Sequence, residues 1–417
     1  MNVLYFDPKF LTPRHAAPTR AYSIARRLVE RGHDVTMVAR DPRWLAVEAT
    51  APLGLLARRE RLDGIDVIWM RIRYEQRFSK WKRLLSYGAY TAAASLATLG
   101  LKRPDVVYAS STPLTSGIPG VFASRLRGVP FVFELQDLWP AAPAALGYLS
   151  NGIELAAAES LERALYARSD RIVVCSEAVV SALVRRGIPA EKVLLIPNFS
   201  ETELFRPETR DERFRKTHGL EGKFLAVYSG AMGHTNGVYQ LADAAAVLKQ
   251  RGDDRVQILL VGDGNERPAF ERRVAEEGLD NVLVLPPQPR EAMPGIVGAC
   301  DVTLTIFTPH PALALNSPNK FFDSLAAGKP VVVNVDGWLR ALVEENDAGV
   351  YVPAGSPDAL ADALSGLAGE PDRLRTMGEN ARELAVREFA RDLLADRLAE
   401  DLERLAGRNG PRPSVRR

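Results

Sequence analysis

The chain has 417 residues, of which 46% are hydrophobic and 25% charged, a composition typical of a globular protein with two or three domains. Its 54 basic and 52 acidic residues give a net charge of +2. That balance excludes a dedicated nucleic-acid binder, which needs a basic excess to neutralise phosphates. The two cysteines, Cys175 and Cys300, each lie in an apolar run. We expect buried thiols in a reducing compartment, because two separated cysteines make neither a disulfide framework nor a metal site.

The first residues, MNVLYFDPKF, contain an apolar run that ends at Asp7 and Pro8. This pattern predicts a first β-strand and not a signal peptide, so a cytoplasmic protein is expected. One later segment, Leu84 to Leu101, is free of charge over a length at the lower edge of what can span a membrane. It is rich in Ala, Ser, Thr and Gly, so the composition favours a buried helix of an α/β domain over a membrane span.

Apolar strand-like runs alternate with helix-length amphipathic stretches along most of the chain. One series begins at residue 2 and a second at Lys223, and such alternation predicts parallel sheets covered on both faces. We therefore predict an α/β fold of two Rossmann-like domains, residues 1–210 and 211–384, facing each other across a cleft. A charged helix over about 371–406 is expected, with residues 385–406 packing back on the first domain. The Pro/Gly/Arg-rich tail, 407–417, is predicted to be disordered.

The stretch NSPNKFFDSLAAGKPVVVN, residues 316–334, carries the most specific functional pattern. Ser317 and Pro318 predict a helix start, with Ser317 as the N-cap. The free N–H groups of that start and the charge of Lys320 would form an anion site. Asp323 lies three residues further on, on the same helix face, where a carboxylate can accept ribose hydroxyls. A phosphate site beside a ribose site indicates a nucleotide; the alternative is an exposed Lys/Asp pair without function.

The run DSLAAGKPVVVN resembles the second half of the donor-site signature of retaining GT-B glycosyltransferases of family four. That family has two glutamates eight positions apart, and the second binds the nucleotide ribose. Asp323 falls on the second position and Leu315 on the first, so one carboxylate of the pattern is missing. This departure is similar to a sub-branch that transfers N-acetylfucosamine and related sugars in bacterial surface-polysaccharide assembly, with a motif like S-P-x-K-F-x-D/E.

The resemblance extends over nearly the whole chain, through segments such as VVCSEAVVSALVRRGIPAEKVLLIPNFSETELFRP and VYSGAMGHTNGVYQLADAA. It implies a nucleoside-diphosphate sugar as donor, with UDP favoured, and a hexosyl or N-acetylhexosaminyl group to be transferred. In the family, the loop at Gly230 supplies an Arg and a Lys to the diphosphate, but here those positions are Ala231 and Asn236. The implied donor-binding residues are Gly230, His234, Asn236, Ser317, Asn319, Lys320 and Asp323.

On the N-terminal side, the resemblance points to His15 and Arg20 as contacts for the acceptor or a phosphate. The family's frequent His-Asp pair reads Gln136-Asp137 here, directly after a strand. Asp137 and Lys320 are therefore predicted to be catalytic, Asp137 by orienting the acceptor and Lys320 by stabilising the leaving diphosphate. The resemblance implies neither a cofactor nor a metal.

The segment RIRYEQRFSKWKRLLSYGAY, residues 71–90, mixes basic and aromatic residues. Such a mixture suits an anionic membrane surface, and the alternative is a solvated loop before a helix. The predicted docking residues are Arg77, Lys80, Trp81, Lys82 and Arg83. They would hold the protein peripherally at the inner membrane, within reach of a polyprenyl-diphosphate-linked or other glycan acceptor.

Two other functions remain open from the sequence. One is a nucleotide-sugar epimerase on the same fold, which would need acid and base residues that act on the donor. The other is a non-catalytic nucleotide-sugar-binding protein, which the missing carboxylate at Leu315 would permit.

Overall fold

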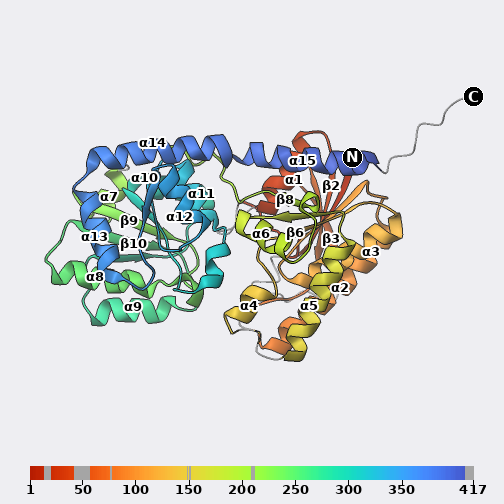
Figure 1. Ribbon diagram of the computed structural model, residues 1–417, viewed down its shortest axis with the longest axis horizontal. Helices are drawn as coiled ribbons and strands as arrows, with labels where there is room; N and C mark the ends of the chain where they lie inside the picture. Colours follow the sequence, from red (N-terminus) through yellow and green to blue (C-terminus); the bar gives the residue numbers. More distant parts are fainter. Residues whose placement is uncertain are drawn as a thin grey trace, which may run out of the picture. The chain divides into compact units, whose positions relative to one another are not determined.

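The computed structural model describes residues 1–13, 20–41, 57–75, 78–147, 149, 152–207 and 212–408 (Figure 1). The chain forms two compact units. The first consists of the described parts of 1–12, 19–197 and 394–417, and the second of Pro13 and the described parts of 198–393. The prediction of two Rossmann-like α/β domains is confirmed, since each unit has a largely parallel sheet with helices packed against it.

The sheet of the first unit has the strand order β3-β4-β2-β1-β5-β6-β7-β8 in the described residues. Its strands are β1 (Asn2–Phe6), β2 (Asp34–Arg40), β3 (Ala57–Leu62), β4 (Ile65–Met70), β5 (Val106–Ser110), β6 (Phe131–Leu135), β7 (Arg171–Val174) and β8 (Val193–Leu195). All neighbours pair in parallel except β3, which runs antiparallel to β4 at the edge. Strands β1, β5 and β6 are apolar and buried along almost their full length, as a sheet covered on both faces requires.

The helices of the first unit lie in two groups (Figure 1). One group contains α1 (Arg20–Glu30) and most of α15 (Arg391–Arg408). The other contains α2 (Lys80–Ala97), α3 (Gly117–Arg127), α4 (Ala141–Ala145), α5 (Gly152–Arg168) and α6 (Glu177–Arg185). Right-handed crossovers explain this division, because the chain leaves β1 in one direction along the sheet and returns from β4 to β5 in the other.

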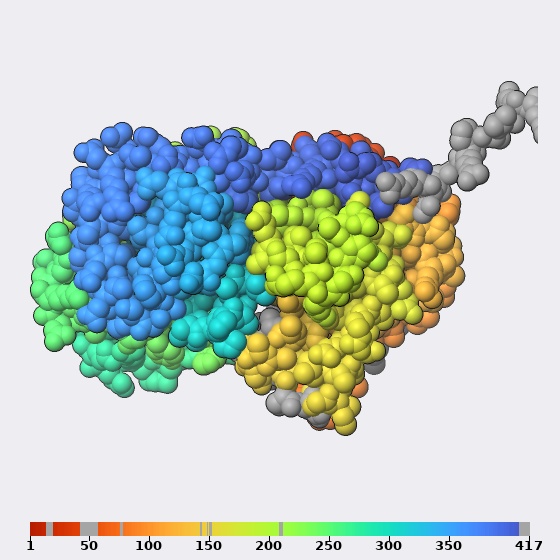
Figure 2. Space-filling model, viewed as in Figure 1, coloured from red at the N-terminus to blue at the C-terminus, as the bar shows by residue number. Residues whose placement is uncertain are grey.

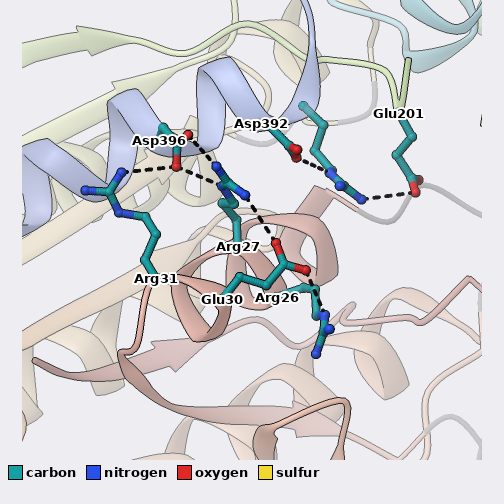
Figure 3. A network of polar contacts seen from close by, with 8 residues as sticks. Arg26, Arg27, Glu30, Arg31, Glu201, Asp392 and Asp396 are labelled. Atoms are coloured by element: carbon teal, nitrogen blue, oxygen red, sulfur yellow. Dashed lines mark hydrogen bonds and ion pairs between the residues drawn. The ribbon is translucent and has the colours of Figure 1, made fainter. Parts of the chain in front are cut away.

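Ion pairs join α15 to α1 within the first unit (Figure 3). Arg27 Nη2 lies 2.7 Å from Asp396 Oδ2, and Arg31 Nη1 lies 3.1 Å from Asp396 Oδ1. Arg31 also pairs with Glu403, whose carboxylate accepts a hydrogen bond from His33 Nε2. These contacts hold the C-terminal helix against α1.

The uncharged segment Leu84 to Leu101 corrects one expectation. It is not a buried helix: α2 and the following 3₁₀ turn η2 (Thr98–Gly100) lie at the surface, and only Ser86, Tyr90 and Ala94 of α2 are buried. Ser86, Tyr90 and Ala94 face inward, and apolar side chains such as Leu85 (73% exposed) face outward. Within the described part of the chain, no helix combines the length and apolar character needed to cross a membrane.

The second unit contains a parallel sheet with the order β11-β10-β9-β12-β13-β14. Its strands are β9 (Phe224–Ser229), β10 (Val256–Val261), β11 (Val282–Leu285), β12 (Val302–Thr305), β13 (Val331–Val333) and β14 (Gly349–Tyr351). Its helices are α7 (Glu212–Thr217), α8 (Tyr239–Gln250), α9 (Arg267–Glu276), α10 (Met293–Ala299), α11 (Asn319–Ala326), α12 (Trp338–Glu345), α13 (Pro357–Ala368) and α14 (Pro371–Glu388). Helices α13 and α14 form the blue outer surface of this unit in Figure 2.

The chain changes unit between Pro197 and Asn198, earlier than the predicted domain boundary at residue 210. The reason is that the backbone of Ser200 bridges to Ala390: Ser200 N donates to Phe389 O, and Arg391 N donates to Ser200 O. The same bridge divides the expected helix over 371–406 into α14 and α15. Of the predicted disordered tail, residues 407 and 408 end α15, and the remainder lies outside the described residues.

Candidate functional site

The second sheet has a topological switch point at β9, whose neighbours β10 and β12 lie on opposite sides of it. Ligands of open α/β sheets bind outside the carboxyl ends of the strands at such a point. The residue that follows β9 is Gly230, and the chain that follows β12 leads to α11, the helix that carries the sequence motif. The topology therefore brings the two predicted donor-binding segments to one edge of the sheet.

The loop after β9 is shaped by close backbone contacts. Gly230 has a φ of +127°, a conformation that L residues rarely adopt. A Cβ at Gly262 would lie 1.9 Å from Gly230 O, and one at Gly264 would lie 2.3 Å from Met232 O. The Gly-Asp-Gly turn after β10 thus serves to let two loop backbones touch.

Lys320 lies beside this loop without a hydrogen-bonding partner. Its Nζ is buried, sits 3.4 Å from the centroid of the Tyr228 ring, and has no hydrogen bond in the described part of the chain. A Cβ on Gly230 would approach that Nζ to 3.5 Å, so the glycine leaves the amine room. Burial lowers the pKa of Lys320 well below its usual value. An ammonium that is buried and unpaired is costly, and an arriving anion would relieve that cost.

Ser317 adds a second unsatisfied group at the same end of α11. Its Oγ is buried and has no hydrogen-bond partner among the described residues. The prediction that Ser317 caps the helix is wrong: α11 begins at Asn319, and the cap position is Pro318, whose backbone is extended (φ −77°, ψ 131°). The carbonyl of Ser317 accepts a hydrogen bond from Asn198 Nδ2. Because the hydroxyl is not used by the helix, it stays available to a ligand next to Lys320.

Asp323 is held by two partners within the second unit. Arg290 Nη1 and Nη2 each donate to its carboxylate at 3.1 Å, and Ser200 Oγ donates to Oδ1 at 2.8 Å. Arg290 also pairs with Glu201 at 3.1 Å, and the two carboxylates raise its pKa. Sequence reasoning missed Arg290, which follows β11 and is distant from the motif in the chain. A ribose that uses Asp323 must share the carboxylate with this guanidinium.

His234 and Asn236 form the 3₁₀ turn η5 (His234–Asn236) of the loop after β9. Asn236 Oδ1 accepts from Gly233 N at 3.2 Å, and the carbonyl of His234 accepts from Thr308 Oγ1 at 2.5 Å. The Asn236 side chain therefore stabilises its own turn. The role predicted for His234 at a phosphate stays a prediction, and Lys320 is a positive group beside Gly230.

Arg20 does not have the role predicted from its position. It is buried in the first unit, where Nε donates to Glu134 Oε1 at 2.8 Å. Its Nη1 and Nη2 donate to the carbonyls of Pro197 and Ile196 at 2.7 and 2.8 Å. These partners occupy the guanidinium, so Arg20 stabilises the sheet and does not face a ligand. His15, the other residue predicted there, lies outside the described residues.

The carboxyl edge of the first sheet carries a separate polar group after β1, β5 and β6. Lys9 Nζ donates to Thr112 Oγ1 at 2.8 Å, and Lys9 N donates to Asp7 Oδ1 at 2.7 Å. Asp7 is buried, which raises the pKa of its carboxyl to about 7. Asp137 follows β6 at this edge and is exposed. Asp7 and Lys9 follow β1 at the carboxyl edge of the sheet, where ligands of such sheets bind. No sequence motif indicates these two residues.

The predicted docking residues Lys80, Trp81, Lys82 and Arg83 form the first turn of α2 and are all exposed. Lys80 pairs with Glu154 of α5. Arg77 lies outside the described residues. Across the described chain, no cluster of three or more His, Cys, Asp or Glu side chains is arranged to hold a metal ion.

Two family models match the chain and together span both units. Residues 16–198 match the glycosyl transferase 4-like domain, and residues 210–384 match the glycosyl transferases group 1. Among curated proteins, the chain is 25% identical over 328 residues to WcaI of Escherichia coli K12, named as a colanic acid biosynthesis glycosyl transferase. That match covers 75% of this chain and 78% of WcaI.

Solved structures agree with the fold. Sucrose-phosphate synthase of Thermosynechococcus elongatus has a TM-score of 0.77 at 19% identity, covering 98% of this chain and 100% of its own. HepE of Anabaena, solved in complex with UDP, has a TM-score of 0.69 at 18% identity, covering 97% of this chain and 100% of its own.

Proposed function

Because the chain belongs to the group 1 glycosyltransferases and has the GT-B fold, we propose that it transfers a sugar, with retention, from UDP-sugar to a lipid-linked or glycan acceptor. The expected setting is cell-surface polysaccharide assembly at the cytoplasmic face of the membrane. The observation that carries the donor part of this proposal is the buried, unpaired Nζ of Lys320 beside Gly230.

A nucleoside diphosphate satisfies the groups that the protein leaves open. Its phosphate oxygens would accept from Lys320 Nζ and Ser317 Oγ, both of which lack partners among the described residues. Charge-assisted bonds of this kind are about twice as strong as neutral ones. The ribose would reach the carboxylate of Asp323, in competition with Arg290. The base is proposed to be uracil, in line with the UDP complex of HepE.

In the proposed reaction, the bond between the sugar C1 and the diphosphate oxygen breaks as the acceptor hydroxyl forms a new bond to C1 on the same face. The hydroxyl proton passes to the departing diphosphate oxygen. Lys320 stabilises the negative charge that grows on the leaving group. Electrostatic stabilisation of this kind is usually the largest single contribution to the rate enhancement of an enzyme. Asp137 orients the acceptor hydroxyl, and Asp7 and Lys9 fix the loop beside it.

The acceptor is proposed to be linked to a polyprenyl diphosphate, so the protein must meet a membrane surface. The basic and aromatic first turn of α2, with Trp81 73% exposed, supports this part of the proposal. The name of WcaI, which places that relative in colanic acid biosynthesis, supports a role in polysaccharide assembly.

The donor proposal is tested by calorimetry with a panel of nucleotides. UDP is expected to bind the wild-type protein and to lose at least about 1.5–3 kcal/mol in Lys320→Ala, the contribution of a hydrogen bond to a charged group. Asp323→Ala is expected to weaken UDP by about 1 kcal/mol or more, because a ribose acceptor is lost. Lys216→Ala, which removes an exposed lysine from α7, serves as the matched control and leaves affinity unchanged.

Two outcomes contradict this proposal. If no nucleotide binds, the edge of the second sheet is not a donor site. If UDP-sugar binds tightly but neither transfer nor hydrolysis of the donor is detected with lipid-linked acceptors, the protein is a binding protein and not a transferase.

A further inference from the structure

Exposed large apolar side chains concentrate on one side of the first unit. Of the twelve such residues in the described chain, nine belong to α2, η2, α3 and α5: Trp81, Leu84, Leu85, Leu96, Leu99, Ile118, Phe122, Leu126 and Ile153. These helices pack together, α3 against both α2 and α5, and appear orange to yellow in Figures 1 and 2. We name this surface the α2–α3–α5 face. Single exposed apolar residues need no explanation, but a contiguous group marks an interaction surface.

A groove runs between α3 and α5 on this face. Its volume is about 560 Å³, and its wall is almost entirely apolar, with Val121 and Phe122 on one side and Leu161 and Leu165 on the other. Arg125 and Arg168 are the charged residues of its lining. An apolar trough with guanidinium groups on its lining suits a hydrocarbon chain attached to an anionic headgroup.

The charge of the face is strongly positive. Helices α2, α3 and α5 hold seven basic residues (Lys80, Lys82, Arg83, Arg125, Arg127, Arg163 and Arg168) and three acidic residues (Glu154, Glu159 and Glu162), a net of +4, whereas the whole chain carries +2. Glu154 of α5 pairs with Lys80, which leaves the excess on the face large. A second copy of this face would repel the first, whereas an anionic bilayer attracts it.

From these observations we infer that the α2–α3–α5 face docks flat on an anionic lipid bilayer and that the groove between α3 and α5 receives a lipid acyl chain. This inference rests on the proposed function, which requires a lipid-linked acceptor. It extends the predicted membrane contact from the first turn of α2 to the whole α2–α3–α5 face. Helices α2, α3 and α5 each begin near the carboxyl ends of the first sheet's strands. Docking therefore brings Asp7, Lys9 and Asp137 next to the lipid headgroups, where the sugar of a lipid-linked acceptor lies.

The first test is co-sedimentation of the full chain with vesicles of phosphatidylcholine alone or with about one third phosphatidylglycerol. Binding is expected only with the anionic lipid, and salt should weaken it. Leu85→Glu and Phe122→Glu, on α2 and at the groove, should each lower partitioning about tenfold or more. Val386→Glu, at an exposed apolar position of α14, is the matched control and should bind as the wild type does.

Insertion is tested with lipids brominated in the acyl chain, which quench tryptophan only when the ring enters the hydrocarbon region. Quenching is expected in the wild type and should be largely lost in Trp81→Phe, while sedimentation of that variant stays unchanged. Equal binding to neutral and anionic vesicles, or equal loss in Val386→Glu and Leu85→Glu, overturns the inference. So does a dimer in analytical ultracentrifugation that Leu85→Glu dissociates, because the face would then meet a second copy.

UDP calorimetry separates this inference from the proposed function. Leu85→Glu and Phe122→Glu lie in the first unit and should bind UDP as the wild type does. If vesicle binding fails while UDP binding holds, only the docking inference is lost; if UDP binding fails in the wild type, the donor proposal is lost whatever the vesicles show.

Discussion

Arg20 in the first unit and Lys320 in the second are cations near the carboxyl ends of parallel strands, yet their surroundings are opposite. Arg20 donates to the buried carboxylate of Glu134 and to two backbone carbonyls. Lys320 faces an aromatic ring, and its Nζ has no hydrogen bond in the described chain. The difference teaches that a buried cation indicates a ligand only when its own fold leaves it unsatisfied, because a satisfied one is already part of the structure.

The largest expected effect comes from breaking the satisfied pair. Arg20→Met should lower the free energy of unfolding by about 3–5 kcal/mol, because Glu134 is left as an uncompensated buried charge. Denaturant unfolding measures this. The double variant Arg20→Met/Glu134→Leu should recover a large part of the loss, and a double variant no more stable than Arg20→Met would show that the ion pair is not the cause.

Asp7 gives the next largest effect, and it depends on pH. Its folded pKa, raised to about 7 by burial, lies above the unfolded value of 3.8, so the folded protein holds this proton more tightly. The associated stability is present below pH 4 and is lost as the pH rises through about 7. Asp7→Asn should therefore be more stable than the wild type at pH 8, by about 1–3 kcal/mol, and similar to it at pH 4. An equal difference at both values would contradict the account.

Lys320→Met should change stability in the direction opposite to Arg20→Met. Removing an amine that is buried without a hydrogen-bond partner leaves no polar group unpaired and loses only the contact with the Tyr228 ring, so the free energy of unfolding should stay the same or rise by about 1 kcal/mol. The same denaturant experiment measures it, with UDP absent. A loss comparable to that of Arg20→Met would mean that Lys320 has a structural partner and would end the contrast between the two cations.

Ser317→Ala should have the smallest effect on folding stability. Its hydroxyl has no partner within the described residues, so folding stability should be unchanged, while UDP affinity should fall by about 0.5–1.5 kcal/mol if a phosphate oxygen uses it. Thermal unfolding and calorimetry on one preparation give both values. A stability loss with unchanged UDP affinity would assign the hydroxyl to the fold.

The sequence predicted the parts of this molecule that depend on local pattern. Apolar runs located the strands, and the order of segments along the chain brought Gly230 and Lys320 to one sheet edge. It could not predict the partners of Arg20, because Glu134 and the carbonyl of Pro197 are distant in the chain and are brought near only by the sheet. The role of Arg290 could not be predicted either, because its partner Asp323 is distant from it in the chain.

Two local errors have physical causes as well. The start of α11 was placed too early because Pro318 keeps an extended backbone and takes the cap position from Ser317. The prediction that α2 is buried rested on its composition and did not use the helical spacing of its apolar residues. Ser86, Tyr90 and Ala94 pack inward and the leucines point outward, so the position of each residue around the helix, and not the composition, distinguishes α2 from a core helix.

The central claim is that Lys320 stays unpaired until a nucleotide diphosphate reaches it. Because burial lowers the pKa of Lys320 well below its usual value, the folded free protein holds this proton less tightly than an exposed lysine does, and a bound diphosphate should raise the pKa again. Calorimetry of UDP binding at pH 8 in buffers of different ionisation enthalpy measures proton uptake directly. The account predicts proton uptake on UDP binding in the wild type that is lost in Lys320→Met. Tight UDP binding with no proton uptake in the wild type, or equal uptake in Lys320→Met, would contradict it.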